Sequence, residues 1–171
     1  ADVLAAPQSV LERALGAAMG ERVWHLARGI DARDIQTERV EKSIGHEETF
    51  AVDVTDDGFL RSELLRLSDR VAKRLRSSGL LAGTVAIKVR FSDFTTVSRS
   101  RALGEATDVG QRLGDEARSL FDAIDRRDAV RLIGVRAEKL QAPGGFAALW
   151  DDDAERRRLE GALDDASARF G

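Results

Sequence analysis

The chain has 171 residues, of which 43% are hydrophobic and 33% are charged, and its formal net charge is −3. The absence of cysteine excludes disulfides and thiolate metal sites, and His25 and His46 are too far apart in the sequence to indicate a metal site. No apolar run approaches the roughly 18 residues of a membrane span, and residues 1–20 lack a signal-peptide pattern, so we expect a cytoplasmic protein with no membrane partner.

The negative charge is concentrated at one end of the chain. Residues 151–171 hold seven acidic and four basic side chains, so this segment carries −3 and residues 1–150 sum to zero. A neutral domain can still present a basic face when its acidic side chains lie on other surfaces. The net charge therefore does not exclude nucleic acid as a partner.

The first part of the chain predicts helices followed by a linker. Apolar side chains recur at helical spacing from Val10 to Leu26, and Gly29 ends the pattern. Residues 31–41 alternate charges without a clear period, which is typical of an extended linker between domains.

A strand and a long amphipathic helix are predicted next. The strand covers residues 42–55 and places Phe50, Val52 and Val54 on one face. The helix covers residues 59–77 and has one apolar stripe. The stripe consists of Leu60, Leu64, Leu67, Val71 and Leu75.

Residues 84–103 predict a β-hairpin with an apolar face and a basic face. Lys88 and Arg90 point away from the apolar side of the first strand, and Asp93 lies in the turn. Cations and hydroxyls on a rigid sheet can contact phosphates without reading bases, although a merely solvated face would have a similar composition. The apolar positions are Val85, Ile87, Val89 and Phe91, and the polar positions of the return strand are Ser98, Arg99, Ser100 and Arg101.

A second helix and a last strand complete the pattern. The helix begins at Thr107 or Asp108, and the strand, residues 129–140, places Gly134 and Arg136 on the face opposite its apolar side chains. A glycine in the middle of a strand indicates that something approaches the backbone closely, and a phosphate is one candidate. The stripe of the helix is Leu113, Ala117, Leu120 and Ile124, and the inward residues of the strand are Ile133 and Val135.

The element order is therefore β-α-β-β-α-β, an α+β domain whose two helices cover one face of a four-stranded, mostly antiparallel sheet. Lys88, Arg90 and Arg136 are expected on the other face, which carries no aromatic side chain of the kind that stacks RNA bases.

Four segments resemble the Y-family translesion DNA polymerases of the bacterial DNA polymerase IV type. They are LARGIDARDI (26–35), EKSIGHEETF (41–50), VAIKVRFSDFTTVSRSRAL (85–103) and VRLIGVRAEKL (130–140). The resemblance implies the helical end of a thumb domain, a linker, the DNA-binding little finger and a C-terminal tail. These parts would occupy residues 1–30, 31–41, 42–141 and 142–171 respectively.

The resemblance also implies that catalysis resides elsewhere. The catalytic carboxylates of the family, with their magnesium ions, belong to a palm domain that this sequence does not contain, so we expect no catalytic residue, no cofactor and no polymerase activity of this chain alone. We expect a monomer associated with the bacterial nucleoid.

Primer–template DNA is the implied partner, held by its phosphates. Some relatives have two adjacent arginines where this chain has Arg131 and Leu132, which puts one template contact in doubt. The expected contacts, including the three cations on the sheet face opposite the helices, are Lys42, Ser43, Lys88, Arg90, Ser98, Arg99, Ser100, Arg101, Arg131 and Arg136.

The tail holds a degenerate version of the peptide with which the family binds the replication sliding clamp. Phe146, Leu149 and Trp150 provide the apolar side chains, but the glutamine that normally opens the peptide is missing. Phe146 and Trp150 could instead pack back on the domain. Two alternative functions are a protein-interaction module that docks on the clamp or another repair protein, and a stand-alone enzyme, for which no motif is present.

Overall fold

The structure is a computed structural model that describes residues 3–31, 41–125, 128–143 and 153–170. The chain divides into two compact units, residues 1–40 and residues 41–171. In the first unit, α1 (Gln8–Leu15) and α2 (Ala17–Ala27) pack so closely at Gly20 that a side chain there would meet the α1 backbone at Glu12. No helix among the described residues is long and apolar enough to cross a membrane.

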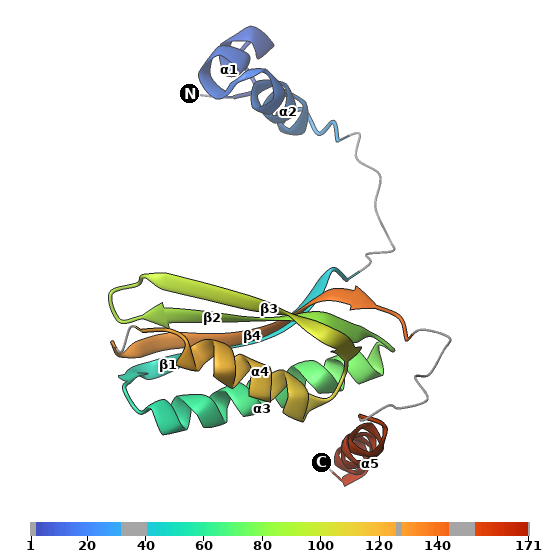
Figure 1. The fold of residues 1–171 in the computed structure, drawn as a ribbon. Coiled ribbons are helices and arrows are strands. Elements are labelled where there is room, and N and C mark those ends of the chain that lie inside the picture. The colour runs from blue at the N-terminus through green and yellow to red at the C-terminus, as the bar shows by residue number, and fades with distance from the viewer. Residues whose placement is uncertain (1–2, 32–40, 126–127, 144–152, 171) are drawn as a thin grey trace. The chain divides into compact units, whose positions relative to one another are not determined.

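The second unit is built on a four-stranded sheet. Its strands are β1 (Ser43–Val54), β2 (Leu81–Phe91), β3 (Thr96–Thr107) and β4 (Val130–Gln141), in the order β1-β4-β2-β3, and every neighbouring pair is antiparallel. Figure 1 shows α3 (Asp57–Ser77) and α4 (Gly110–Asp122) side by side on one face of this sheet. The predicted α+β architecture and its element order are confirmed.

The core lies between the two helices and the sheet. Val85 is paired with Ala137 and Ile87 with Val135, so these side chains point to the same face, and all of them are buried. The apolar stripes predicted for α3 and α4 are buried against them. Gly114 of α4 lies against Leu65 of α3, where a larger residue would separate the helices.

One side chain of β1 does not lie where the sequence indicates. Phe50 and Val54 pack against the core as predicted, but Val52 is 80% exposed. The pairing of β1 with β4 shifts register between Thr49 and Val54, and such an irregularity breaks the two-residue alternation of side chains. Near the start of β1, Ile44 is buried in the core, and the alternation of residues 50–54 did not identify it.

The beginning of α4 also differs from the prediction. The helix begins at Gly110, after Thr107 and Asp108, and Val109 at its N-cap position has no capping side chain. Instead the carboxylate of Glu160 accepts hydrogen bonds from the Gly110 and Gln111 backbone amides, at 2.9 and 3.4 Å. A residue 50 positions away thus neutralises the positive end of α4.

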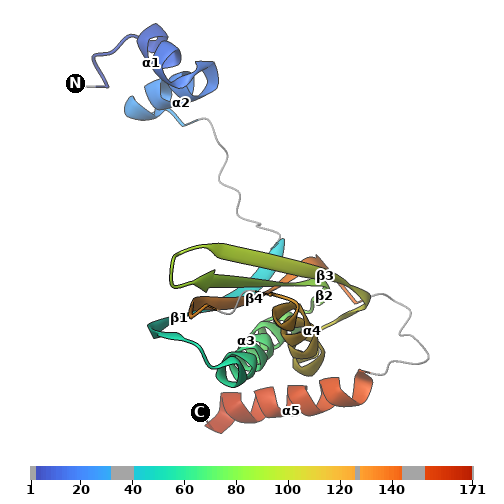
Figure 2. The same cartoon turned by 60° about the vertical axis from the view of Figure 1, so that its left-hand side comes forward.

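Glu160 belongs to α5 (Ala154–Phe170), which lies beneath α3 and α4 in Figure 2. Arg76 of α3 is only 13% exposed and forms ion pairs with Glu160 at 2.5 Å and Asp164 at 2.7 Å. Two further pairs hold the start of the helix, Arg157 to Asp108 at 2.6 Å and Arg112 to Asp153 at 2.5 Å. Burial, followed by the nearby Glu160 carboxylate, raises the pKa of Asp69 on α3.

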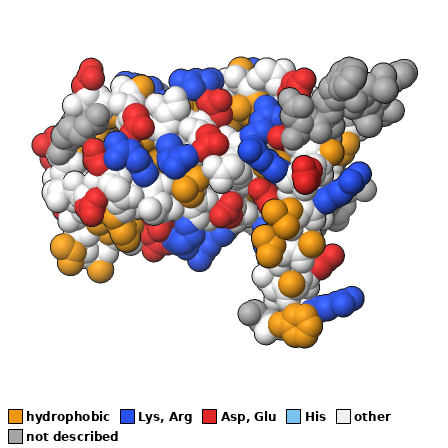
Figure 3. All heavy atoms as spheres, turned by 60° about the horizontal axis from the view of Figure 1, so that its bottom comes forward, with side chains coloured by type: hydrophobic (Ala, Val, Ile, Leu, Met, Phe, Trp, Pro, Cys, Tyr) orange, Lys and Arg blue, Asp and Glu red, His pale blue; other side chains and the backbone are white. Residues whose placement is uncertain are grey.

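Apolar side chains of α5 remain outside these contacts. Leu159, Leu163 and Phe170 are exposed, and hydrophobic atoms are visible along the projecting helix in Figure 3. The docking of α5 therefore depends on charge pairs rather than on the burial of an apolar stripe.

The assignment of faces can be tested with Val89→Asp. Val89 is fully buried on β2, so the variant places an unpaired carboxylate in the core, at a cost of about 3–5 kcal/mol. We expect loss of the cooperative thermal transition followed by circular dichroism, or a large fall in its midpoint. Val52→Asp, which adds the same charge at an exposed site, should melt close to the parent; similar melting of both variants would contradict the assignment.

Candidate nucleic-acid interface

The face of the sheet opposite α3 and α4 contains a shallow hollow of about 480 Å³. Small residues on adjacent strands form its floor. Gly45 of β1 and Ala86 of β2 are both paired with Arg136 of β4, and Gly134 of β4 is paired with Lys88 of β2. The rim carries charged and hydroxyl side chains. This open face, including the expected Lys88, Arg90 and Arg136, is defined by Ser43, Gly45, Glu47, Ala86, Lys88, Arg90, Ser98, Ser100, Gly134, Arg136 and Glu138.

A charge pair crosses the centre of the open face. Glu47 of β1 and Lys88 of β2 are both paired in register with Gly134 of the intervening β4, and the Lys88 Nζ lies 2.9 Å from the nearer Glu47 oxygen. A Cβ at position 134 would lie 2.6 Å from the Glu47 Cγ. Gly134 thus leaves room for the Glu47 side chain, so the close approach that the sequence indicates is made by the methylene groups of the chain's own Glu47.

The other two cations of the open face have weaker or neutral partners. The Arg136 guanidinium lies 3.7 Å from the Glu138 carboxylate, and both side chains are exposed to solvent. The Arg90 Nε donates a hydrogen bond of 3.0 Å to the Thr96 hydroxyl. Both guanidinium groups therefore retain donors that an incoming anion could use.

The return strand of the hairpin divides its polar side chains between the two faces. Ser98 and Ser100 are paired with Lys88 and Ala86, which places their hydroxyls on the open face. Arg99 and Arg101 are paired with Ile87 and Val85, which places both arginines on the helix side of β3, at the edge of the sheet.

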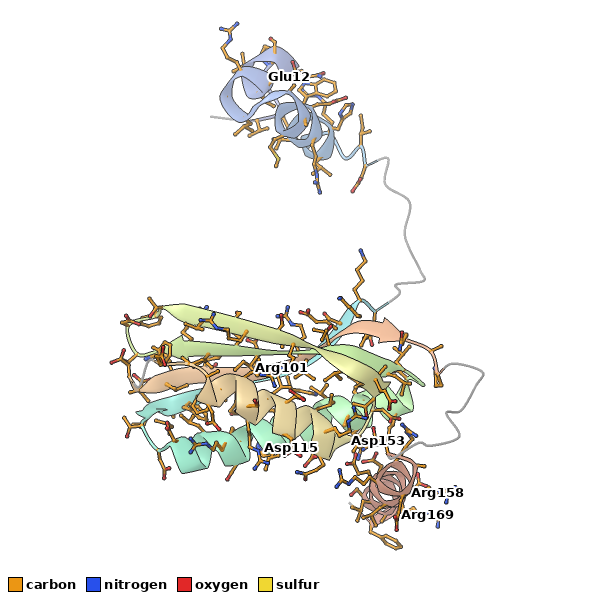
Figure 4. All side chains as sticks on the ribbon, viewed as in Figure 1. Glu12, Arg101, Asp115, Asp153, Arg158 and Arg169 are labelled. Carbon is orange, nitrogen blue, oxygen red and sulfur yellow. The ribbon has the colours of Figure 1, made fainter. Side chains whose placement is uncertain are left out.

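Arg101 is held there by α4. Its Nη1 lies 2.7 Å from the Glu116 carboxylate and donates to the Ser119 hydroxyl at 3.1 Å, and Figure 4 labels it between the sheet and α4. Arg99 is exposed and donates to the Ser98 carbonyl oxygen. Of the four predicted contacts of β3, Ser98, Arg99 and Ser100 line the hollow, whereas Arg101 does not.

The remaining predicted contacts lie at the two ends of the sheet. Lys42 is exposed just before β1, and Ser43 is the first residue of that strand on the open face. Arg131 lies near the opposite end, where β4 shifts register against β2, and forms a 3.4 Å ion pair with Asp53. The predicted clamp-binding residues Phe146, Leu149 and Trp150 lie outside the described residues.

Glu47 is the residue of the site that the sequence did not reveal. Its carboxylate joins Lys88 only because β4 separates β1 from β2, and the order of strands cannot be read from the alternation of side chains.

Within the described parts of the chain, no group of three or more His, Asp or Glu side chains is arranged to hold a metal ion.

Comparison with known proteins identifies the second unit. Residues 41–149 match the C-terminal domain of the impB/mucB/samB family. The chain belongs to this family. The resemblance to the Y-family polymerases of the DNA polymerase IV type is thereby confirmed.

The relatives of this impB/mucB/samB chain include bacterial and archaeal proteins named DNA polymerase IV. It is 38% identical to that of Streptomyces coelicolor over 78% of this chain and 28% of the relative. It is 33% identical to that of Dehalococcoides mccartyi over 98% of this chain and 43% of the relative. The identity is 41% with the protein of Methanoculleus marisnigri, over 71% of this chain and 34% of the relative. The chain thus spans less than half the length of these relatives.

The arginines of α3 affect the pKa of a histidine on β1. His46 of the impB/mucB/samB domain is paired with Val135 and therefore faces the helix side at the edge strand β1. Partial burial, followed by the positive charges of Arg70, Arg74 and Arg66, lowers the pKa of His46 from its usual value. The folded domain therefore holds this imidazole neutral where an unfolded chain would begin to protonate it.

This pKa shift predicts that the stability of the domain decreases as the pH falls from 7.5 toward 5.5. The unfolded chain binds a proton at His46 near pH 6.5, before the folded state does, so acid favours unfolding. Urea unfolding at several pH values measures the effect. In His46→Gln, whose side chain cannot titrate, the free energy of unfolding should depend less on pH. An equally steep pH dependence in this variant would mean that other groups cause it.

Proposed function

We propose that the open face of the sheet binds primer–template DNA through its phosphates, and that the chain is the DNA-holding part of a translesion DNA polymerase. The observation that carries the proposal is a sheet face that no helix of residues 41–125, 128–143 or 153–170 covers. On it Lys88 and Arg136 line a shallow hollow together with serine hydroxyls, and Arg90 follows Lys88 on the same face of β2. The relatives named DNA polymerase IV support the same partner. Such a partner is consistent with a place at the nucleoid.

The binding is electrostatic and is not specific for sequence. Each phosphate that a cation neutralises releases condensed counterions, so the affinity falls steeply with salt. Serine hydroxyls and guanidinium groups contact phosphates without reading the bases. A damaged template can therefore be held by its backbone while the altered base is ignored, which suits a lesion-bypass enzyme.

The carboxylates of the open face oppose this binding. Glu47 is paired with Lys88 at 2.9 Å and Glu138 with Arg136 at 3.7 Å, so phosphates replace these carboxylates as partners of the cations. The Arg136–Glu138 pair is exposed and the Lys88–Glu47 pair is partly exposed, and pairs at the surface are worth about 1 kcal/mol or less. Replacing a carboxylate by a phosphate therefore costs little free energy, but this cost reduces the binding free energy that each phosphate contact contributes.

The chemistry of nucleotidyl transfer is assigned to another part of the polymerase. The family resemblance implies that the catalytic carboxylates and their magnesium ions belong to the palm, and the present chain would hold the DNA substrate. The sliding clamp remains a second proposed partner, through the tail residues Phe146, Leu149 and Trp150.

Removing two open-face cations should weaken DNA binding and reduce its dependence on salt. For Lys88→Ala with Arg136→Ala, we expect the slope of log K against log salt to become shallower by about 1 for each lost phosphate contact. Fluorescence anisotropy with a labelled duplex at several salt concentrations measures both quantities.

The matched control removes the same charge from the helix side. Arg61 pairs with Asp122 and Asp57, and Arg118 pairs with Asp115, all on α3 and α4. Arg61→Ala with Arg118→Ala should leave the affinity and the salt slope near those of the parent. Equal losses in the two double variants would mean that net charge, not the open face, governs binding.

Removing the carboxylate at the centre of the open face should have the opposite effect. Glu47→Gln frees Lys88 and eliminates a repulsion of phosphate, so we expect about threefold tighter binding at low salt and a smaller gain at high salt. Glu155→Gln, an exposed position on α5, makes the same change of charge away from the sheet. Unchanged affinity in Glu47→Gln would mean that Lys88 and Glu47 do not contact the DNA.

A further inference from the structure

The turn between β2 and β3 holds an aromatic residue in a conformation that usually requires glycine. Phe94 donates its backbone amide to the Phe91 carbonyl at 2.9 Å, and Phe91 and Thr95 are joined by a 2.9 Å backbone hydrogen bond that closes the hairpin. In such three-residue loops the last residue adopts a left-handed conformation, for which glycine or asparagine is strongly preferred. Phe94 has φ of +67°.

The strain of Phe94 is not offset by burial of its ring. Bulky side chains are rarely found at positive φ, and such strain persists where the surroundings or a function maintain it. The Phe94 side chain is 63% exposed, so it contributes little to the core. The turn itself is fixed without the ring, because the Asp93 carboxylate accepts a 2.9 Å hydrogen bond from the Thr95 amide.

A cation lies against the exposed ring. The Arg131 guanidinium carbon is 4.8 Å from the centroid of the Phe94 ring, within the range of a cation–π contact. Asp53 of β1 pairs with Arg131 at 3.4 Å and restrains the guanidinium from the other side. The two side chains thus present an aromatic face and a positive charge together at one end of the sheet, the hairpin end in Figure 1.

This end is continuous with the open face. Arg90 of the open face is paired with Thr96, the first residue of β3 after the turn, and donates to its hydroxyl. A DNA strand whose phosphates follow Arg136, Lys88 and Arg90 therefore arrives at the turn.

We propose that Phe94 and Arg131 form a stacking platform for an unpaired base at the junction of duplex and single-stranded template. The platform rests on the function proposed above, and it adds a class of contact that the cations of the open face cannot make. Any base offers an aromatic surface, so stacking tolerates all four bases and many damaged ones. The guanidinium of Arg131 contributes its own plane or charge to the same nucleotide.

The test compares a blunt duplex with the same duplex carrying a single-stranded 5′ overhang that contains 2-aminopurine, whose fluorescence is quenched by stacking. We expect the chain to bind the overhang DNA at least about fivefold more tightly than the blunt duplex, with quenching. In Phe94→Gly, the preference and the quenching should both disappear, while binding to the blunt duplex is retained. Phe94→Trp should preserve both signals.

Two controls separate loss of the ring from loss of the fold. Glycine adopts positive φ freely, so Phe94→Gly should melt at or above the temperature of the parent. Phe170→Ala removes another exposed phenylalanine, 86% exposed on α5, and should retain both the preference and the quenching.

The outcomes distinguish the platform from the proposed function. Two results would overturn the platform alone, provided that the blunt duplex binds in a salt-dependent way. In one, the parent shows no preference for the overhang; in the other, the preference survives in Phe94→Gly. Binding of neither DNA at low salt would overturn the proposed function and the platform together. Loss of the preference only in Phe94→Gly would establish the platform.

Discussion

The packing of α3 and α4 on one face of the sheet, with the other face uncovered by the described residues of the same unit, is the constraint on which the rest of the structure depends. Side chains alternate along β2 and β4, so each strand gives one set of residues to the core and leaves the other set on the open face. The same pairing that buries Val85 and Val135 holds Lys88 and Arg136 away from α3 and α4. The rigidity of the candidate interface is therefore a direct result of the packing on its opposite side.

Local patterns in the sequence predicted most of the fold because they are set by single elements. The stripes of α3 and α4 and the alternation of β2 depend only on helical and strand periodicity, and all of them are buried as expected. Val52 was misplaced because an irregularity in the pairing with β4 interrupts the alternation. The cap of α4 could not be predicted, because the carboxylate that supplies it comes from a distant helix.

The candidate site was predicted less completely, for a topological reason. Lys88, Arg90 and Arg136 follow from alternation alone, whereas Glu47 joins them through the order of strands. Arg99 and Arg101 were grouped with Ser98 and Ser100 by adjacency in the sequence, but neighbours along a strand point to opposite faces. The edge position of β3 keeps both arginines at the surface, although Arg101 is held by α4.

The contact between Glu160 and α4 makes the tail and the domain thermodynamically linked. Whatever detaches α5 must leave the amides of Gly110 and Gln111 without their carboxylate and the mostly buried Arg76 without its ion-pair partners. A helix cap of this kind is worth about 0.5–2 kcal/mol. By reciprocity, a ligand that binds only the detached tail loosens the first turn of α4, and any change that weakens that turn makes the tail easier to capture.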